Sequence, residues 1–213
     1  MGISVTEKRP FLEMVFLVVL MLISALFFPQ FKALFGILPI VYYFVERKIR
    51  GRSRENNGFN FANLLHDIKK SWVWVLLVGI VFQILYVIIY KNYFPEIFAH
   101  VLARAPVIKT FDVKLVITLF ILALGEEITF RGLVQERLQW VMKPHYAIVL
   151  TSIIFALMHI SPGEPKLVAL DLTTIFIDSV IFGIIFYKTK RIYASWIAHA
   201  LANIAATYMI TNL

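Results

Sequence analysis

The sequence predicts an all-α protein built as a polytopic bundle of transmembrane helices. Of its 213 residues, 60% are hydrophobic and 16% are charged, whereas a soluble domain is nearer 45–50% apolar and about 25% charged. Long apolar runs alternate with short basic segments such as 46–54, a pattern typical of membrane spans and their loops. No repeat or linker divides the chain, so we expect 1–213 to form a single integral membrane domain.

The apolar runs predict about seven spans, with six to eight as the range. An amphipathic pattern over 61–72 predicts a short interfacial helix before the third span, and 91–113 should lie along the opposite interface. The fourth span is longer than the roughly 20 residues that a bilayer requires, so its end should project into water. The expected spans are 11–28, 32–46, 72–90, 114–142, 146–160, 167–187 and 192–211.

The basic residues predict the orientation, because cytoplasmic loops carry an excess of Lys and Arg. If the N-terminus is cytoplasmic, the inner segments hold most of these residues, including 47–54, and the outer segments hold only Lys32, Lys91, Arg104, Lys109, Lys114 and Lys166. The first span contains Glu13 and lacks a cleavage pattern, so we expect a retained span and not a signal peptide. The predicted location is the cell membrane, with the lipid bilayer as a partner and the C-terminus outside.

Composition excludes several classes of function. The absence of cysteine rules out disulfides, thiolate nucleophiles and cysteine–zinc sites. The net charge of +8 is interpreted as loop charge, because no polar segment interleaves basic residues with exposed aromatic ones. We therefore expect no nucleic-acid partner.

Two adjacent acids in the fourth span mark the candidate site. Glu126 and Glu127 follow an uncharged run, and charges at membrane depth usually face the bundle interior or a wet cavity. Glu127 and Arg131 are four residues apart, so on a helix they share a face and can form an ion pair. Glu126 lies about 100° around the helix from Glu127 and is free to point elsewhere. The spacing predicts one structural acid and one chemical acid.

Three further polar residues join the acids. His159 closes the fifth span, and His199 and Asn203 are four apart on the seventh. At about 1.5 Å per residue, Glu126 and His199 agree in depth within the inner half of the membrane, whereas His159 is an outlier by that measure. A base for water and donors for an oxyanion are the groups that amide hydrolysis requires.

These residues form three motifs that resemble the CPBP family of intramembrane proteases. They are Glu126-Glu127-Ile-Thr-Phe-Arg131, Phe155 to His159, and His199 to Asn203, in that order on membrane helices. This family comprises CAAX proteases and bacteriocin-processing or immunity (Abi) proteins, and it includes the Ras-converting type of prenyl-protein endopeptidase. The resemblance covers about residues 115–210, which we take as the catalytic core, and the first two spans carry no family signal.

The resemblance implies a role for each motif residue. Glu126 would activate water, His159 would assist, His199 and Asn203 would stabilise the oxyanion, and Glu127 and Arg131 would support them. The family has been described both as metalloproteases and as metal-free glutamate enzymes. Zinc could be held by Glu126, His159 and His199, although these residues lack the H-E-x-x-H spacing. If Asn203 is an oxyanion donor, its neighbour His199 is better placed to donate a proton than to bind zinc, so we expect no obligatory metal.

The sequence leaves rival functions open. The substrate expected of the protease is a peptide or a membrane protein. A bacteriocin-immunity or regulatory binding member of the same family would retain the motifs without cutting any substrate. A proton-coupled transporter is less favoured, because no pair of broken helices occurs in matching halves. For other polar residues we expect structural roles: a hydrogen bond at Asp178, a boundary position for Asp171, helix packing at Ser179 and Gly183, and solvated interfacial histidines at His66, His100 and His145.

Overall fold

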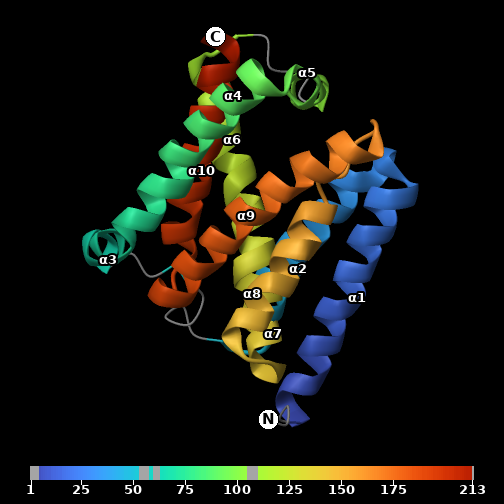
Figure 1. Cartoon of the computed structure of the whole chain (residues 1–213). Helices are drawn as coiled ribbons and strands as arrows, with labels where there is room; N and C mark the ends of the chain where they lie inside the picture. Colours follow the sequence, from blue (N-terminus) through green and yellow to red (C-terminus); the bar gives the residue numbers. More distant parts are fainter. Residues whose placement is uncertain (1–4, 53–57, 60–62, 105–109, 213) are drawn as a thin grey trace.

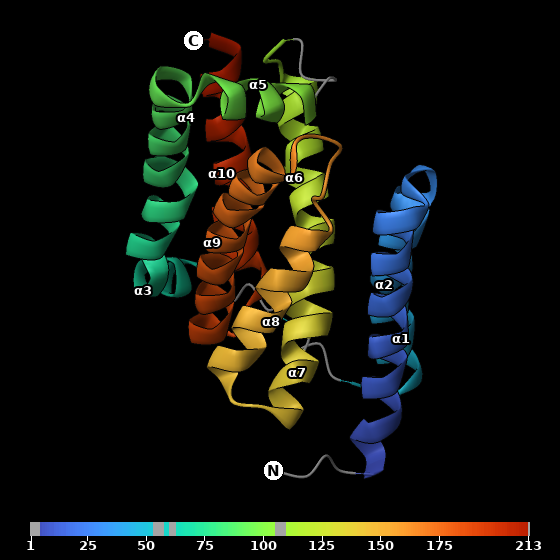
Figure 2. The same ribbon diagram turned by 45° about the vertical axis from the view of Figure 1, so that its right-hand side comes forward.

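The computed structural model describes residues 5–52, 58–59, 63–104 and 110–212, and every regular element in these ranges is a helix. Helices α1 (Val5–Phe27) and α2 (Lys32–Ile49) lie side by side and are joined by the short turn η1 (Pro29–Phe31). This pair is the helical hairpin that the first two apolar runs predict (Figure 2). Pro29 ends the first helix because its ring fixes φ and removes a backbone donor.

The next helical stretch differs from the prediction of an interfacial helix followed by a separate span. Helix α3 (Leu64–Leu76), the π-helical segment η4 (Leu77–Val81) and α4 (Phe82–Tyr93) form one uninterrupted helix. No proline separates the two predicted pieces, so nothing in the backbone stops the helix between them. Helix α5 (Pro95–Arg104) then crosses the end of the molecule where the expected interfacial segment lies (Figure 2).

The helix that carries the acid pair runs without a break from Val113 to Val141, as α6 (Val113–Glu127), the π-helical segment η5 (Ile128–Gln135) and α7 (Glu136–Val141). Its first turn is capped by Asp112, whose side chain accepts a hydrogen bond from the Leu115 N–H at 2.7 Å. Wide π-helical turns inside α-helices occur frequently at functional sites. The segment η5 begins directly after Glu127.

Three helices complete the fold: α8 (Pro144–Leu157), α9 (Pro165–Thr189) and α10 (Ile192–Asn212). Helix α8 ends before the predicted boundary of 160, so His159 lies in the turn that follows it and not in its last turn. The two termini lie at opposite ends of the molecule (Figure 1).

Three helical stretches are long and apolar enough to cross a membrane: Glu7–Phe27, Leu64–Tyr93 and Pro165–Thr189. The chain is therefore an all-helical membrane protein, and the total of about seven spans stays a prediction. The other candidates are shorter or more polar. Helix α8 has 14 residues, and the stretch 113–141 carries the acid pair and Arg131.

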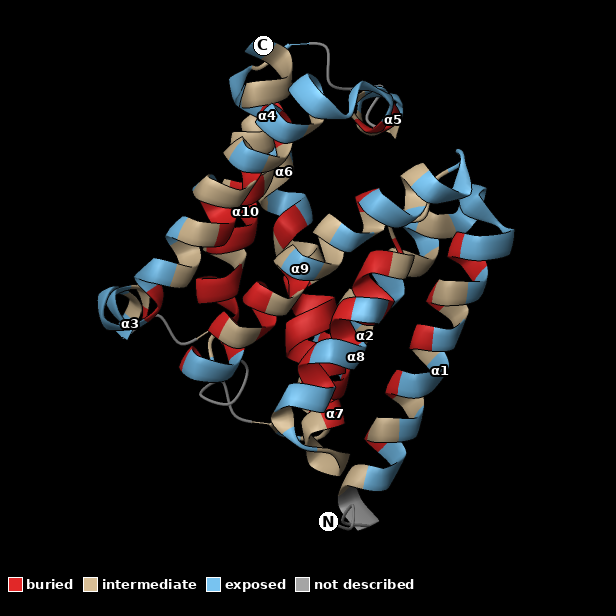
Figure 3. Ribbon diagram, viewed as in Figure 1, coloured by how far each residue is buried: buried red, intermediate tan, exposed pale blue. Residues whose placement is uncertain are grey.

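Burial is concentrated where the acid-bearing helix meets α8, α9 and α10 (Figure 3). Every residue of η5 is buried, and its apolar side chains pack in one cluster with Tyr43 of α2 and Phe155 of α8. The outer faces of α1 and α2 instead expose large apolar side chains, such as Phe16 at 62% and Phe27 at 71%. Such exposed apolar faces are suited to lipid, in which the helices keep all backbone hydrogen bonds internal.

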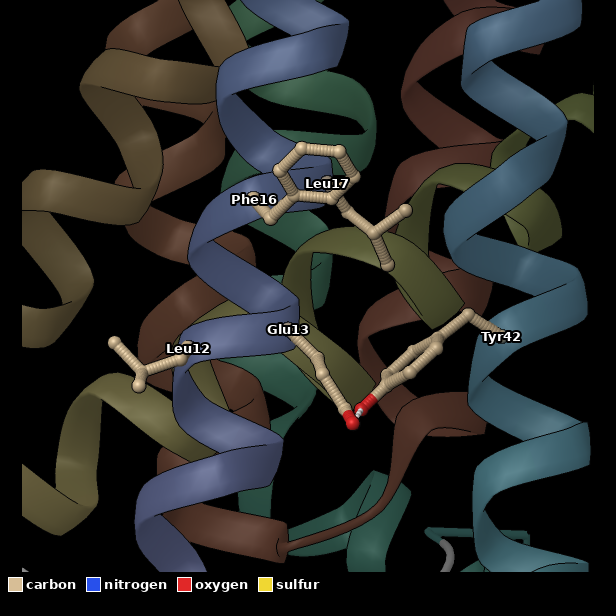
Figure 4. Close-up of a pocket in the computed structure, with 5 residues that line it drawn as sticks. All are labelled: Leu12, Glu13, Phe16, Leu17 and Tyr42. Carbon is tan, nitrogen blue, oxygen red and sulfur yellow. Dashed lines mark hydrogen bonds between the residues drawn. The ribbon is translucent and has the colours of Figure 1, made fainter.

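A network of ion pairs ties α1, α2 and α7 together near the N-terminal end. Arg137 is buried, donates to the Pro10 carbonyl at 2.6 Å and pairs with Glu46 at 2.9 Å. Tyr42 donates to Glu13 at 2.6 Å, and the two side chains reach toward each other from α2 and α1 across a hollow of about 360 Å³ (Figure 4). The network fixes the hairpin to the rest of the bundle.

Candidate active site

The Glu127–Arg131 pair lies at the centre of the bundle. Both side chains are fully buried, and Arg131 Nε lies 3.2 Å from Glu127 Oε2, which is the ion pair that their spacing predicts. Arg131 also donates to Ser179 Oγ of α9 at 2.8 Å and to Gln135 Oε1 at 3.4 Å. The pair is therefore held by two helices at once, as a buried charge pair must be if it is to be tolerated.

Glu127 also positions His199. The Nδ1 atom of His199 lies 2.9 Å from Glu127 Oε1, and since a carboxylate can only accept, Nδ1 carries the proton. The imidazole is stacked on Phe182 of α9, with ring centroids 4.6 Å apart and planes inclined by 18°. These two contacts fix both the orientation and the tautomer of the ring, and direct its Nε2 atom toward Glu126.

His159 is fixed in a similar way by the end of α8. Its Nδ1 atom lies 2.9 Å from the Phe155 carbonyl oxygen, so Nδ1 donates there. Its ring lies against the Phe155 ring, with centroids 4.6 Å apart. The free nitrogen is then Nε2, as in His199.

Unlike Glu127, Glu126 is not paired with an arginine in the described part of the chain. Its Oε2 atom lies 3.5 Å from His199 Nε2 and 4.0 Å from His159 Nε2. Its side chain is 35% exposed, whereas that of Glu127 is 0% exposed. The structure thus brings Glu126, His159 and His199 together, including the histidine whose predicted depth did not match. Because His159 lies in the turn after α8, the straight-helix depth estimate does not apply to it.

Asn203 is not joined to this group by a contact. It lies one helical turn after His199 on α10, is half-buried, and makes no hydrogen bond to another described residue. Its role as an oxyanion donor stays a prediction, because the group that it would bind belongs to a substrate.

Sequence reasoning missed three residues that support the site. Gln135 donates to the Gly183 carbonyl at 2.9 Å, which together with the Arg131–Ser179 contact fastens η5 to α9. Ser179 and Gly183 were expected only to allow close helix packing. An uncharged polar residue four positions after Arg131 was the signal that could have pointed to Gln135.

The structure confirms some of the predictions for polar residues outside the site and contradicts one. Asp178 accepts a hydrogen bond from Gln83 at 2.8 Å, as expected of a structural acid. His66 and His145 are exposed, but the prediction for His100 was wrong. His100 is buried, lies 3.3 Å from Ser161 Oγ, and approaches Asp171, because α5 folds back onto the loop before α9 and onto α9 itself.

No group of three or more His, Cys, Asp or Glu side chains in the described ranges is arranged to hold a metal ion. As they stand, Glu126, His159 and His199 are not a preformed zinc set, which requires ligands at about 2.0–2.2 Å from one point. The hollow in Figure 4 lies between α1 and α2 and is lined by none of the site residues.

Comparison with known families identifies the part of the chain that carries this geometry. Residues 110–205 match the family model described as "Type II CAAX prenyl endopeptidase Rce1-like", within five residues of the predicted core at either end. Comparisons with curated proteins and with solved structures gave no match. The matched segment contains all three motifs, from Glu126 to Asn203. Residues 110–205 are therefore similar to the CAAX protease family, which is a family of proteases.

Proposed function

We propose that the protein is an intramembrane endopeptidase in which Glu126 activates the water that cleaves a peptide bond. The observation that carries the proposal is the environment of this carboxylate. It faces two histidine Nε2 atoms at 3.5 and 4.0 Å, it remains accessible, and no arginine neutralises it among the described residues. A general base must be within reach of the proton that it takes and must not be sequestered.

The proposed hydrolysis gives each of these side chains one role. Glu126 removes a proton from water. His159 Nε2 accepts a hydrogen bond from the other O–H of that water and so holds the water in position. The oxygen attacks the carbonyl carbon, and Asn203, with His199 in its imidazolium form, donates to the resulting oxyanion. The carboxylate of Glu127 balances that imidazolium at 2.9 Å. Glu126 then passes its proton to the leaving nitrogen as the C–N bond breaks.

We further propose that no metal is obligatory, and no step above passes through one. If zinc were bound, it would be held by Glu126, His159 and His199, and it would supply Lewis-acid activation of the same water. The substrate class is a peptide or a membrane protein, processed either as in CAAX maturation or as in bacteriocin and pheromone processing.

The orientation is also a proposal, with the N-terminus cytoplasmic, the C-terminus outside, and the cell membrane as the location. The opposite placement of the two termini in Figure 1 supports an odd number of crossings. A reporter fused after Arg54 should be cytoplasmic, and one fused after Leu213 should be outside. The reverse pair would overturn the orientation.

Comparative membrane proteomics of wild type and Glu126→Gln tests the function. The variant keeps the shape of the side chain and removes the base, so at least one precursor should accumulate uncut while the protein itself reaches normal levels. The matched control is Glu96→Gln, which changes an exposed acid on α5. If Glu126→Gln leaves every precursor and every phenotype unchanged, the immunity or binding function replaces the protease.

A further inference from the structure

The turn that carries His159 lies between two helices and is itself not helical. Helix α8 ends at Leu157, and the stretch 160–164 that leads to α9 has no helical residue. The hydrogen bond from His159 Nδ1 to the Phe155 carbonyl is made within one segment, so it orients the imidazole relative to α8 alone. Because helix ends fray, the place of His159 relative to Glu126 of α6 depends on what holds the turn from outside.

Helix α5 contacts this turn at two positions through one side chain. The Nε2 atom of His100 lies 3.3 Å from the Oγ atom of Ser161, two residues after His159. The imidazole also covers Gly163, because a Cβ atom placed on that glycine would lie 2.7 Å from His100 Cε1 and 2.8 Å from Nδ1. A glycine is what allows the ring to approach the backbone so closely. The side chain of His100 is only 7% exposed, so it fills the space between α5 and the turn.

Asp171 of α9 fixes α5 in this position. Its carboxylate is buried and lies 3.1 Å from Arg104 Nε and 3.8 Å from His100 Nε2. His100 and Arg104 are four residues apart on α5, so they share the face that is directed at α9. Ile97, three residues before His100, is also buried and extends that face. Helix α5 is therefore fastened to α9 and, through His100, to the turn after α8.

The group of Ser161, His100 and Asp171 does not have the geometry of a second nucleophilic site. In a serine triad the hydroxyl bonds one imidazole nitrogen, and the carboxylate orients the ring through the other nitrogen. Here Ser161 and Asp171 both approach Nε2 of His100, and Arg104 pairs with the carboxylate. These contacts suit a clamp on the turn and not catalysis by Ser161.

We propose that His100 is a positioning residue, which acts through Ser161 and Gly163 to hold His159 in place beside Glu126. This inference rests on the proposed endopeptidase function, in which His159 Nε2 holds the water that Glu126 activates. The Nε2 atom of His159 lies 4.0 Å from Glu126 Oε2. If the turn were released from His100, the imidazole of His159 would move relative to the carboxylate, and the water would lose one of its two protein partners.

The first experiment uses the full-length protein in lipid bilayers, with a peptide that the wild type cleaves. Because a misplacement of 1 Å can cost about a hundredfold in rate, His100→Ala should lower kcat about tenfold. KM should change little, because His100 does not contact the substrate. His100→Gln should restore part of kcat, since its amide can still bond to Ser161. Hydrogen exchange of the backbone amides in 158–164 should be faster in His100→Ala, and exchange in η5 should stay as in wild type.

A double-mutant cycle separates positioning from general stabilisation of the fold. If His100 acts through His159, then His100→Ala should have little further effect on kcat in a His159→Ala background. A side chain that only stabilises the fold would lower activity by the same factor in both backgrounds. Single-turnover rates with excess enzyme measure the weak cleavage that remains in the His159→Ala proteins.

Gly163→Ala tests the same contact from the side of the turn. The added Cβ atom would lie 2.7 Å from the His100 ring, so the ring or the turn must move. This variant should lower kcat as His100→Ala does, and it keeps the proposal testable if His100→Ala folds poorly. The matched control is His145→Ala, which removes an exposed histidine at the other end of α8 and should leave kcat, KM and exchange unchanged.

Wild-type kcat in both His100→Ala and Gly163→Ala would overturn the positioning role. So would a change confined to KM, an equal loss in both backgrounds of the cycle, or unchanged exchange in 158–164. If Glu126→Gln cleaves the peptide as well as wild type, the endopeptidase function itself fails, and the positioning role fails with it. Loss of cleavage in Glu126→Gln together with wild-type kcat in His100→Ala would reject the positioning role alone, so the two failures are distinguishable.

Discussion

Two of the charge clusters inside this apolar molecule differ in how their acids are paired. In the network of α1, α2 and α7, each acid is bound by at least one arginine: Glu13 by Arg9 and Arg50, and Glu46 by Arg137. In the cluster of α6, η5, α9 and α10, Glu127 is bound in the same way by Arg131, whereas Glu126 forms no ion pair with an arginine of the described residues and lies near His159 and His199.

The difference separates the charges that are paired within the fold from the one that we propose for chemistry. An acid bound by guanidinium groups is neutralised, and its removal exposes an uncompensated partner. An acid that faces two imidazole Nε2 atoms and open space can exchange a proton. Glu126 and Glu127 are neighbours in sequence, yet the structure assigns them to opposite sides of this distinction.

The largest expected effect on folding comes from breaking the buried pair. Arg131→Ala leaves Glu127 as an uncompensated buried charge and should cost about 3–5 kcal/mol of stability. Thermal unfolding in detergent, together with the yield of folded protein, measures this loss. An Arg131→Ala protein as stable as wild type would show that the pair does not hold η5.

A smaller effect, on catalysis and not on folding, is expected at Asn203. Asn203→Ala should raise the barrier to cleavage by about 2.7–4 kcal/mol if the amide binds the oxyanion. The folded yield should stay near wild type, because the amide has no hydrogen-bond partner among the described residues. Steady-state kinetics with a defined peptide measures the change, and unaltered kcat with Asn203→Ala would remove this residue from the mechanism.

The outermost ion pair should contribute least. Arg9 is 86% exposed in its pair with Glu13, and exposed pairs contribute about 0–1 kcal/mol because water and salt screen them. Arg9→Ala should therefore shift the unfolding temperature slightly and leave cleavage unchanged. If Arg9→Ala lost as much stability as Arg131→Ala, burial would not account for the difference between the two clusters.

Removing metal should not cause a loss of activity that zinc readdition restores. Metal content of the purified protein is measured first, and activity is then followed through chelation and zinc readdition. Stoichiometric zinc whose removal abolishes cleavage and whose return restores it would contradict the metal-free mechanism. Inhibition by the chelator without restoration by zinc would not count, since a chelator can act directly on a membrane enzyme.

The sequence was sufficient for most of the helices and for the pairing of Glu127 with Arg131, because both depend on local periodicity, but it divided the continuous helix Leu64–Tyr93 into two elements. It also grouped Glu126, His159 and His199, through three motifs in order. It could not predict the contacts made by Ser179 and Gln135, because these depend on how α9 crosses η5. His100 was misplaced for the same reason, since its burial arises from the tertiary fold of α5 and not from its own segment.

The most direct test compares one acid from each cluster, as Glu126→Gln and Glu13→Gln, in the same purified preparation with the same peptide. Each substitution removes a negative charge and preserves shape. The account predicts that Glu126→Gln loses cleavage and keeps the wild-type unfolding temperature, whereas Glu13→Gln keeps cleavage and unfolds at a lower temperature. Cleavage that persists in Glu126→Gln would contradict the central claim that this carboxylate activates the water.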